Sequence, residues 1–379
     1  MPYHYEWPGV SMKGPWDLAP HTAAKHKIYG KYLDAWFPIL IQRYGEVTYA
    51  EGFSGCGIYS HGEEGSPIIA LSRLLRRRRE FSQLQRARFL LVEKERHNAH
   101  LLAGELGKIL NVGAPVFDFD DGVVEVRLRC GECQHELPKL LNESKVWGKP
   151  ILAIFDTFGG GVPAQLLANI ATNKSSEVIY TVLPQHFARF HSDHARGDAI
   201  FGDTAWRDVA QHEPYKKREH IAREFETTMR TAGFNHVLRF NLGTSRGDQL
   251  NLLYGTCSAK GVEKFKDALW NADPVQGAGF QDPRDPWQQM LPMHHEPDLA
   301  PLERLLHGLL LNSPNRSQTV EQLREFTKLH TIYKASHVTR CLTKLEKDKL
   351  IQTPTGALRL GTTTITARPP KPEQLSMLG

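Results

Sequence analysis

Apolar segments that read as strands alternate with helical segments through the first half of this chain. Such an alternation is typical of α/β proteins, in which helices cover both faces of a mostly parallel sheet. Four of the segments are continuous runs of Val, Ile, Leu and Phe, as expected for strands buried on both faces. The sequence therefore predicts a Rossmann-like α/β fold with strand regions at 47–51, 87–95, 114–126, 150–156 and 177–184.

Helical patterns flank these strands. Residues 21–44 place apolar side chains on one face at helical spacing, which predicts a long amphipathic helix before the first strand. Near residue 240 two further β-rich segments, HVLRFNLGTS and QLNLLYGTCS, precede a helix at 261–270. We expect them to close the sheet as an antiparallel pair at one edge.

A length of 379 residues favours two domains. Residues 1–20 read as an irregular N-terminal arm, and 21–272 hold the α/β pattern. Residues 273–297 are rich in proline and predict a linker. Residues 298–379 contain three helical patterns and then two short β-rich segments, which is the order of a small α+β winged helix-turn-helix domain.

Composition narrows the class of protein. Hydrophobic residues make up 40% and charged residues 23%, which fits a globular protein. We expect neither a membrane span nor a secretory signal, and five scattered cysteines favour a reducing, cytoplasmic location over a disulfide scaffold. The net charge of +5 permits a nucleic-acid partner without demanding one.

A glycine-rich turn follows the first strand. Glu51 ends the strand, and glycines at 52, 55 and 57 let the backbone turn sharply and approach a ligand, for which a nucleotide or adenosyl group is the natural candidate. Glu93 ends the second strand, where a carboxylate can accept both ribose hydroxyls of such a ligand. A plain βα turn and a solvated strand end are the alternatives.

Three more acidic residues end predicted strands. Asp118 and Asp120, at the third strand, can accept the exocyclic amine of an adenine, or can simply cap a turn. Asp156, at the fourth strand, can hold and orient a target amine, and Phe158 can stack on a planar base. The alternative is a turn aspartate beside a core phenylalanine.

His21 and Lys25 are four residues apart on the predicted first helix and so share a face. Without other context they read as a solvated helix face. Cys130, Cys133 and His135 form one CxxC with a nearby histidine, which favours a surface loop, so no metal site is predicted. A dense basic block reads as a solvated helix face or a phosphate-contacting surface: Arg73, Arg76, Arg77, Arg78 and Arg79.

Four sequence blocks in this order carry a resemblance: HTAAKHKIYGKYLDAWFPIL, AEGFSGCGIYSHGEEGSPIIAL, FDTFGGGVP and YGTCSAKGVEKFKDALW. They resemble the three-Cys-motif partner (TcmP) proteins, whose genes neighbour a radical-SAM protein, and the resemblance covers about residues 20–270. It implies a class I methyltransferase fold that uses S-adenosylmethionine, a winged helix-turn-helix tail, and the radical-SAM protein as a partner. A more distant similarity is to the 23S ribosomal RNA adenine-N6 methyltransferases.

The resemblance also implies roles for individual residues. His21 and Lys25 would contact the cofactor or close the site. Glu51, Phe53, Gly55 and Gly57 would form the cofactor turn, with the two glycines under the methionine part. Glu93 would hold the ribose and Asp118 or Asp120 the adenine. Asp156 would hold the target amine with Phe158 beside it. The chain departs from the pattern at Glu51, which replaces Asp, and at Thr157, which replaces Pro.

The sequence thus predicts a methyltransferase that acts on a nucleic-acid base, with DNA favoured over RNA and with no membrane partner. The winged domain would contact the nucleic acid through its third helix, at Lys334, His337, Arg340 and Lys344. Two alternatives stay open: a non-catalytic accessory partner of the radical-SAM protein, which Thr157 favours, and a DNA-binding regulator that senses an adenosyl ligand. The target base and the oligomeric state stay open as well.

Overall fold

The computed structural model of the protein describes residues 13–157, 160–189, 193–243, 249–272, 297–353, 358 and 360–368. Most of the expected linker at 273–297 and Phe158 lie outside these residues, as does most of the expected arm before residue 13. Within the described part of the chain, no helix has both the length and the apolar character that a membrane span needs.

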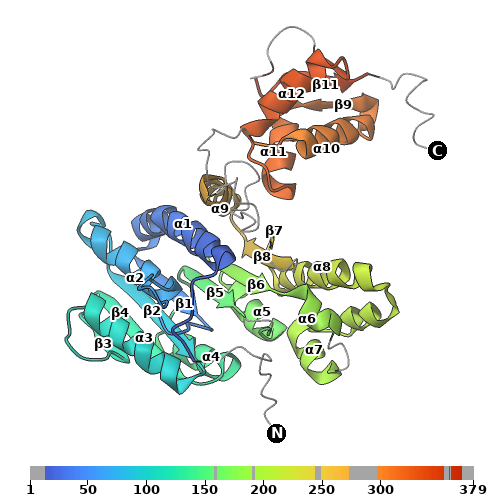
Figure 1. Cartoon of the computed structure of the whole chain (residues 1–379). Helices are drawn as coiled ribbons and strands as arrows, with labels where there is room; N and C mark the ends of the chain where they lie inside the picture. The colour runs from blue at the N-terminus through green and yellow to red at the C-terminus, as the bar shows by residue number, and fades with distance from the viewer. Residues whose placement is uncertain are drawn as a thin grey trace.

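An eight-stranded sheet forms the centre of the molecule, with the strand order β3-β4-β2-β1-β5-β6-β8-β7 (Figure 1). The five strands from β4 to β6 in that order are parallel, and β8 and β7 form the antiparallel pair expected at one edge. A mixed α/β fold with a large, mostly parallel sheet is therefore confirmed. Its strands are β1 (Glu46–Glu51), β2 (Arg86–Glu93), β3 (Asp118–Asp120), β4 (Val124–Cys130), β5 (Ile151–Asp156), β6 (Glu177–Val182), β7 (His236–Gly243) and β8 (Gln249–Thr256).

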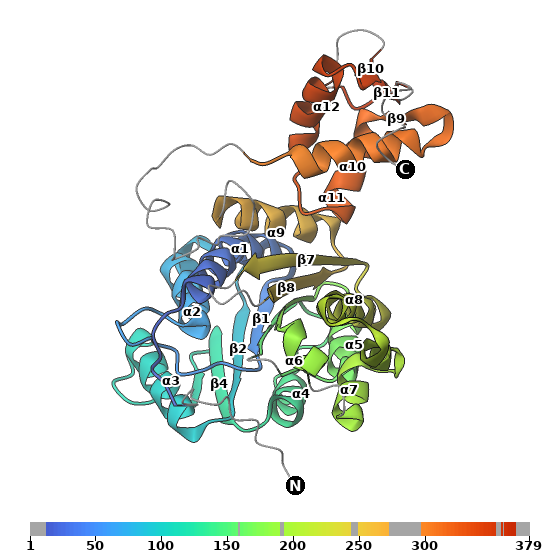
Figure 2. The same ribbon diagram turned by 45° about the vertical axis from the view of Figure 1, so that its right-hand side comes forward.

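Helices cover both faces of this sheet (Figure 2). One face packs against α1 (Pro20–Tyr44), α2 (Ser66–Arg77), α3 (Arg96–Ile109) and α9 (Ala259–Ala272). The other packs against α4 (Cys133–Glu143), α5 (Ala164–Thr172), α6 (Pro184–Arg189), α7 (His194–Phe201) and α8 (Pro214–Ala232). Short 3-10 turns follow α2 at Arg78–Glu80 and α7 at Ala205–Gln211.

The alternation of side chains along a strand decides which residues face α1. Along β1, Tyr49 belongs to the core on the α1 side and Ala50 to the core on the other side. In β5 the same alternation places Ile154 on the α1 side and Phe155 opposite. Glu51 and Asp156, each two residues further along, therefore project towards α1.

A smaller unit follows at the C-terminus. It contains α10 (Ala300–Leu311), a 3-10 turn (Pro314–Arg316), β9 (Ser317–Thr319), α11 (Val320–His330), α12 (His337–Lys347), β10 (Ile351–Gln352) and β11 (Thr364–Ala367). The three strands form an antiparallel sheet with β11 in the middle. Three helices are confirmed where the sequence predicts them; the short strand β9 is an addition.

The turn between α11 and α12 packs against α9. The buried Lys266 Nζ donates to three backbone carbonyl oxygens, those of Thr327 and Tyr333 at 2.9 Å each and that of Lys328 at 2.5 Å. Trp270 Nε1 donates to the Ile332 carbonyl at 2.9 Å. Burial lowers the pKa of Lys266 to about 7, so this amine is only partly charged at neutral pH. Its hydrogen bonds are favourable because the last carbonyls of a helix have no partners within the helix. The C-terminal unit is thus fastened to the larger one through α9.

Candidate functional site

The candidate site lies where the order of the strands reverses. From β1 the chain continues to β2 on one side and returns later as β5 on the other, so β1 and β5 are neighbours at a topological switch point. In open α/β sheets, ligands bind outside the carboxyl ends of the strands at such a point. The glycine turn follows β1 and Asp156 ends β5, so the fold brings both to this place.

Lys25 and Asp156 form an ion pair at the carboxyl end of β5. Lys25 Nζ lies 2.7 Å from Asp156 Oδ1 and 2.6 Å from Oδ2. The two side chains are 6% and 17% exposed, so the pair is largely removed from water. Burial alone would raise the pKa of Asp156, but the adjacent ammonium outweighs it and the pKa lies below the usual value. Asp156 is therefore a carboxylate at neutral pH.

Two histidines of α1 lie beside this pair. Burial lowers the pKa of His21 and lowers that of His26 to about 4, and the Lys25 charge adds to both shifts. Both imidazoles are thus neutral at pH 7, and Lys25 supplies the positive charge next to Asp156. The His26 ring packs edge-on against the ring of Tyr59, with centroids 5.5 Å apart. The fold brings His21 and Lys25 to the carboxyl end of β5, and their contact with a cofactor stays a prediction. Tyr59 is a neighbour that the sequence did not indicate.

Glu51 is fully buried under α1. Its carboxyl group accepts hydrogen bonds from Tyr49 Oη at 2.7 Å and from Ser66 Oγ at 2.6 Å. Burial raises the pKa of Glu51 to about 8, since two hydroxyl donors offset only part of the cost of desolvating the charge. In this arrangement Glu51 joins β1 to the start of α2.

Two positions of the glycine turn favour glycine for the same backbone reason, and one of them also for lack of space. Gly55 and Gly57 have φ angles of 64° and 75°, in the left-handed region that other residues rarely adopt. A Cβ atom on Gly57 would also lie 2.6 Å from Leu102 Cδ1 of α3. At Gly55 the nearest atom to such a Cβ would be 3.8 Å away, on the ring of Trp16.

Glu93 joins the ends of β1 and β2 to the start of α3. Its Oε2 accepts the Gly55 N–H at 2.8 Å, and its Oε1 accepts the Glu95 N–H at 2.8 Å. Burial raises the pKa of Glu93, although these backbone donors oppose the shift. The carboxyl group thus lies at the glycine turn, as its predicted role requires.

The predicted position of Asp118 and Asp120, at the end of a third strand beside the ligand, is wrong. They lie on β3, an exposed antiparallel strand at the sheet edge, whereas the third parallel strand is β4. Asp118 pairs with Arg129 at 3.0 Å, and Asp120 pairs with Arg86 at the amino end of β2. Asp120 is therefore at the end of the sheet opposite to the glycine turn. The carboxyl end of β4 is followed instead by Gly131 and Glu132, and Glu132 pairs with Lys94 at 2.6 Å.

Thr157 uses its side chain for local structure. Its buried hydroxyl contacts the carbonyl oxygens of Gly160 at 2.8 Å and Thr181 at 2.9 Å. Phe158, the predicted base-stacking residue, lies outside the described residues. Phe53 is half-buried against the core on the α4 side.

The cysteine–histidine motif is dispersed. The Cys130 thiol contacts the Lys94 carbonyl at 3.6 Å, and burial raises the pKa of Cys133 to about 12. In the part of the chain that the structure describes, no three His, Cys, Asp or Glu side chains gather as a metal site would require.

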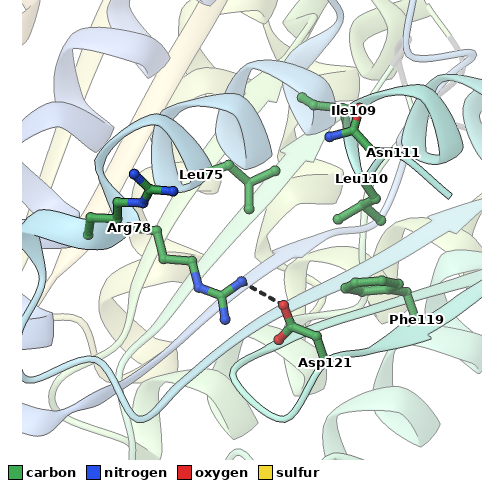
Figure 3. A pocket seen from close by; sticks show the side chains of 8 residues that line it. Leu75, Arg78, Ile109, Leu110, Asn111, Phe119 and Asp121 are labelled. Carbon is green, nitrogen blue, oxygen red and sulfur yellow. Dashed lines mark hydrogen bonds and ion pairs between the residues drawn. The ribbon is translucent and has the colours of Figure 1, made fainter.

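A groove of about 580 Å³ lies away from the glycine turn, between the ends of α2 and α3 and the strand β3 (Figure 3). Arg78 and Arg79 of the basic block line it together with Leu75 and Phe119. Arg78 Nη1 pairs across it with Asp121 at 2.6 Å. Three other arginines of the block pair with acidic side chains: Arg73 with Asp34, Arg76 with Glu64 and Arg77 with Glu80.

The predicted nucleic-acid contacts of the third helix separate into two groups. Arg340 and Lys344 are exposed on α12, although Lys344 pairs with Glu303 of α10 at 3.0 Å. Lys334 pairs with Asp267 of α9 at 2.8 Å. His337 is buried, with its ring 4.7 Å from that of Trp270, so its expected outward position is wrong. The docking of α9 covers the start of α12.

No family model matches the chain, and no curated protein matches it. Among solved structures it is similar to the O-methyltransferase TomG from Streptomyces achromogenes, in complex with SAM, at 15% identity and a TM-score of 0.31, over 60% of this chain and 78% of that one. An O-methyltransferase from Bacillus cereus, in complex with SAH, matches at 14% identity and a TM-score of 0.30, over 60% and 80% of the two chains. These similarities are loose, and nothing about a ligand or substrate follows from them.

Proposed function

We propose that the chain is an S-adenosylmethionine-dependent methyltransferase whose acceptor is a neutral amine of a nucleic-acid base. The observation that carries the proposal is the meeting of three features at the switch point: the glycine turn, the Glu93 carboxyl group and the Lys25–Asp156 pair. The first two suit an adenosyl ligand, and the third suits a reacting group.

The residues at the turn fit the cofactor. Glu93 Oε2 accepts only the Gly55 N–H among the described groups, whereas Oε1 accepts the Glu95 N–H and also faces Asn98 Nδ2 at 3.5 Å, so a lone pair of Oε2 is left for a ribose hydroxyl. Gly55 carries no side chain, so the backbone of the turn can approach a ligand closely, and a Cβ atom there would already meet the Trp16 ring at 3.8 Å. When bound, S-adenosylmethionine would supply a methyl group already activated on a sulfonium, so the chain has to align and desolvate the acceptor.

Asp156 is suited to hold that acceptor. A carboxylate has about four lone-pair positions. Lys25 Nζ contacts both oxygens and the Thr181 side chain also hydrogen-bonds the carboxylate, and lone-pair positions are left for another N–H. A carboxylate that accepts a hydrogen bond from the amine of the substrate orients the amine nitrogen. It also stabilises the positive charge that develops on this nitrogen during methyl transfer.

Lys25 favours a methyl acceptor that carries no positive charge. The Lys25 ammonium within 2.7 Å of the Asp156 oxygens repels an alkylammonium group that approaches the same carboxylate. Exocyclic amines of nucleobases are neutral at pH 7 and meet no such repulsion. The neutral His21 imidazole, near enough to Asp156 for the carboxylate to affect its pKa, is available to take up the proton that the amine releases.

The C-terminal unit supports a nucleic-acid substrate. Its order of helix, strand, two helices and two strands suits a winged helix-turn-helix domain, with α12 as the third helix. Arg340, Lys344 and Lys347 are exposed on α12 and would contact phosphates, with DNA favoured over RNA. We also propose, from the sequence resemblance, that the protein works beside a three-Cys-motif radical-SAM protein.

A second candidate function rests on the same ion pair. Lys25 already contacts both oxygens of Asp156, and Thr157 stands where prolines are expected. A chain in which this pair only stabilises the fold would bind the adenosyl ligand without transferring methyl groups. It would then act as a binding partner of the radical-SAM protein.

Calorimetric titration with S-adenosylmethionine and S-adenosylhomocysteine tests the cofactor. We expect micromolar affinity for the wild type and at least tenfold weaker binding for Glu93→Ala, since a hydrogen bond to a charged group contributes roughly 1.5–3 kcal/mol. Asp120→Asn is the matched control, because this acid lies on β3 and pairs with Arg86 at the end of the sheet opposite to the glycine turn. Transfer of a tritiated methyl group to DNA and RNA then separates the two candidates. A wild type that binds neither ligand would refute the methyltransferase proposal.

A further inference from the structure

Residues 13–19 are the described part of the expected N-terminal arm, and we call this part the arm from here on. They cross the loop that follows β1 and the start of α3. Gly14 N donates to Asn98 Oδ1 at 2.9 Å, and the Gly14 carbonyl oxygen lies 3.0 Å from His97 Nε2. Further along the arm, the Trp16 carbonyl oxygen accepts the Ser60 N–H at 2.8 Å, and Asp17 accepts the Ser60 hydroxyl. The arm is therefore fastened on both sides of the glycine turn.

Close contacts hold the arm directly against this turn. A Cβ atom on Gly14 would lie 2.7 Å from Cys56 Sγ, so the arm backbone packs on the thiol of the turn itself. The Trp16 ring also lies at this turn, because a Cβ atom on Gly55 would meet it at 3.8 Å, which is van der Waals contact. The indole ring is thus next to the backbone of Gly55.

The arm also reaches the carboxyl group proposed to hold the ribose. Asn98, which accepts the Gly14 N–H, is buried, and its Nδ2 lies 3.5 Å from Glu93 Oε1. Glu93 in turn accepts the Gly55 N–H. The arm, α3 and the glycine turn therefore share one set of hydrogen bonds around the proposed cofactor site.

The arm continues without a break into α1. The helix starts at Pro20, where the Ala19 carbonyl oxygen accepts the N–H groups of Thr22 and Ala23. Its first two turns carry His21 and Lys25 of the candidate site. One continuous segment thus borders the glycine turn and then supplies the partner of Asp156.

We infer that Trp16 is a cofactor-binding residue and that the arm closes the site over the bound adenosyl ligand. The inference rests on the proposed function. The indole ring offers a flat apolar surface to an adenine, and stacking of a base on an aromatic side chain is a strong contact. This stacking would place the adenine at Gly55, where the family resemblance implies the methionine part instead. Since the arm is fastened on both sides of the turn, the ligand leaves only when the arm moves. Trp16 and the arm therefore limit the rate of ligand release.

Stopped-flow displacement of S-adenosylhomocysteine from the full chain tests this inference. For Trp16→Ala we expect dissociation about tenfold faster and a correspondingly higher Kd, with a smaller effect for Trp16→Phe, which keeps an aromatic ring. Trp147→Ala is the matched control. That tryptophan lies between α4 and β5, is 37% exposed and donates to Asn142 of α4. Thermal unfolding of each variant reports whether the fold is intact.

Two results would overturn the inference separately from the proposed function. If the wild type binds the ligand and Trp16→Ala releases it at the wild-type rate, the arm does not close the site, while the methyltransferase proposal stands. Equal acceleration in Trp16→Ala and Trp147→Ala leads to the same conclusion. A wild type that binds no adenosyl ligand refutes both proposals together.

Discussion

Lys25 Nζ lies within 2.7 Å of both carboxylate oxygens of Asp156, although 131 residues separate the two in the chain. The pair joins the first helix to the central strand β5 at the point where the strand order reverses. It is the charged centre of the candidate site, and it also fixes the position of α1 over the sheet.

The first prediction concerns the coupling between these two residues. Lys25→Met and Asp156→Asn should each lower the free energy of unfolding by roughly 2–4 kcal/mol, because each leaves a largely buried charge without its partner. The double variant should lose less than the sum of the two. Urea unfolding of the four proteins measures the coupling energy. Strictly additive losses would mean that the pair does not stabilise the fold.

The second prediction concerns catalysis. Asp156→Asn should keep the affinity for S-adenosylmethionine within a few-fold and lower methyl transfer by about 10- to 100-fold, since it removes the charge that stabilises the reacting nitrogen. Initial rates with tritiated donor on a methyl-accepting nucleic acid measure the effect. Unchanged rates would assign the pair a structural role alone.

The third prediction concerns pH. The pKa of Glu51 is raised from 4.5 to about 8, so between these values the folded state binds more protons here than the unfolded state. The contribution of this residue to stability is therefore lost as pH rises, by at most roughly 1.4 kcal/mol per pH unit. Glu51→Gln, which keeps a neutral partner for Tyr49 and Ser66, should gain stability relative to wild type from pH 5 to pH 8. Parallel pH profiles would contradict the assignment.

The fourth prediction compares two glycines. Gly55→Ala should cost roughly 1–2 kcal/mol of stability for its left-handed backbone. Gly57→Ala should cost more, because its Cβ would also meet Leu102 Cδ1 at 2.6 Å. Chemical unfolding measures both, and equal losses would mean that α3 moves away without cost.

The fifth prediction concerns the contact between the two units. Lys266→Met removes the donor to three carbonyl oxygens, and we expect a loss of at least roughly 1.5–3 kcal/mol and separate unfolding of the C-terminal unit. Lys260→Met is the control on the same helix, since Lys260 is 57% exposed. Calorimetry should show two transitions for the first variant and wild-type behaviour for the second.

Most of the fold follows from local sequence patterns. Continuous apolar runs alternating with amphipathic helices require a parallel sheet with two covered faces, and the observed strands and helices agree with that reading. The single strand predicted at 114–126 is wrong. The segment holds β3 and the start of β4 around a turn at Asp121 and Gly122, and the Asp-Gly pair is a hairpin signal. Because the turn divides the segment, Asp118 and Asp120 belong to the edge strand β3.

The sequence alone could place chemically useful residues at strand ends and on one face of the first helix, because strand and helix periodicity are local properties. Only the tertiary structure decided which of them meet. The Lys25–Asp156 pair, the burial that raises the pKa of Glu51 and the docking of α9 on the start of α12 depend on contacts between distant segments. Burial and charge pairing are set by those contacts, so no local pattern encodes them.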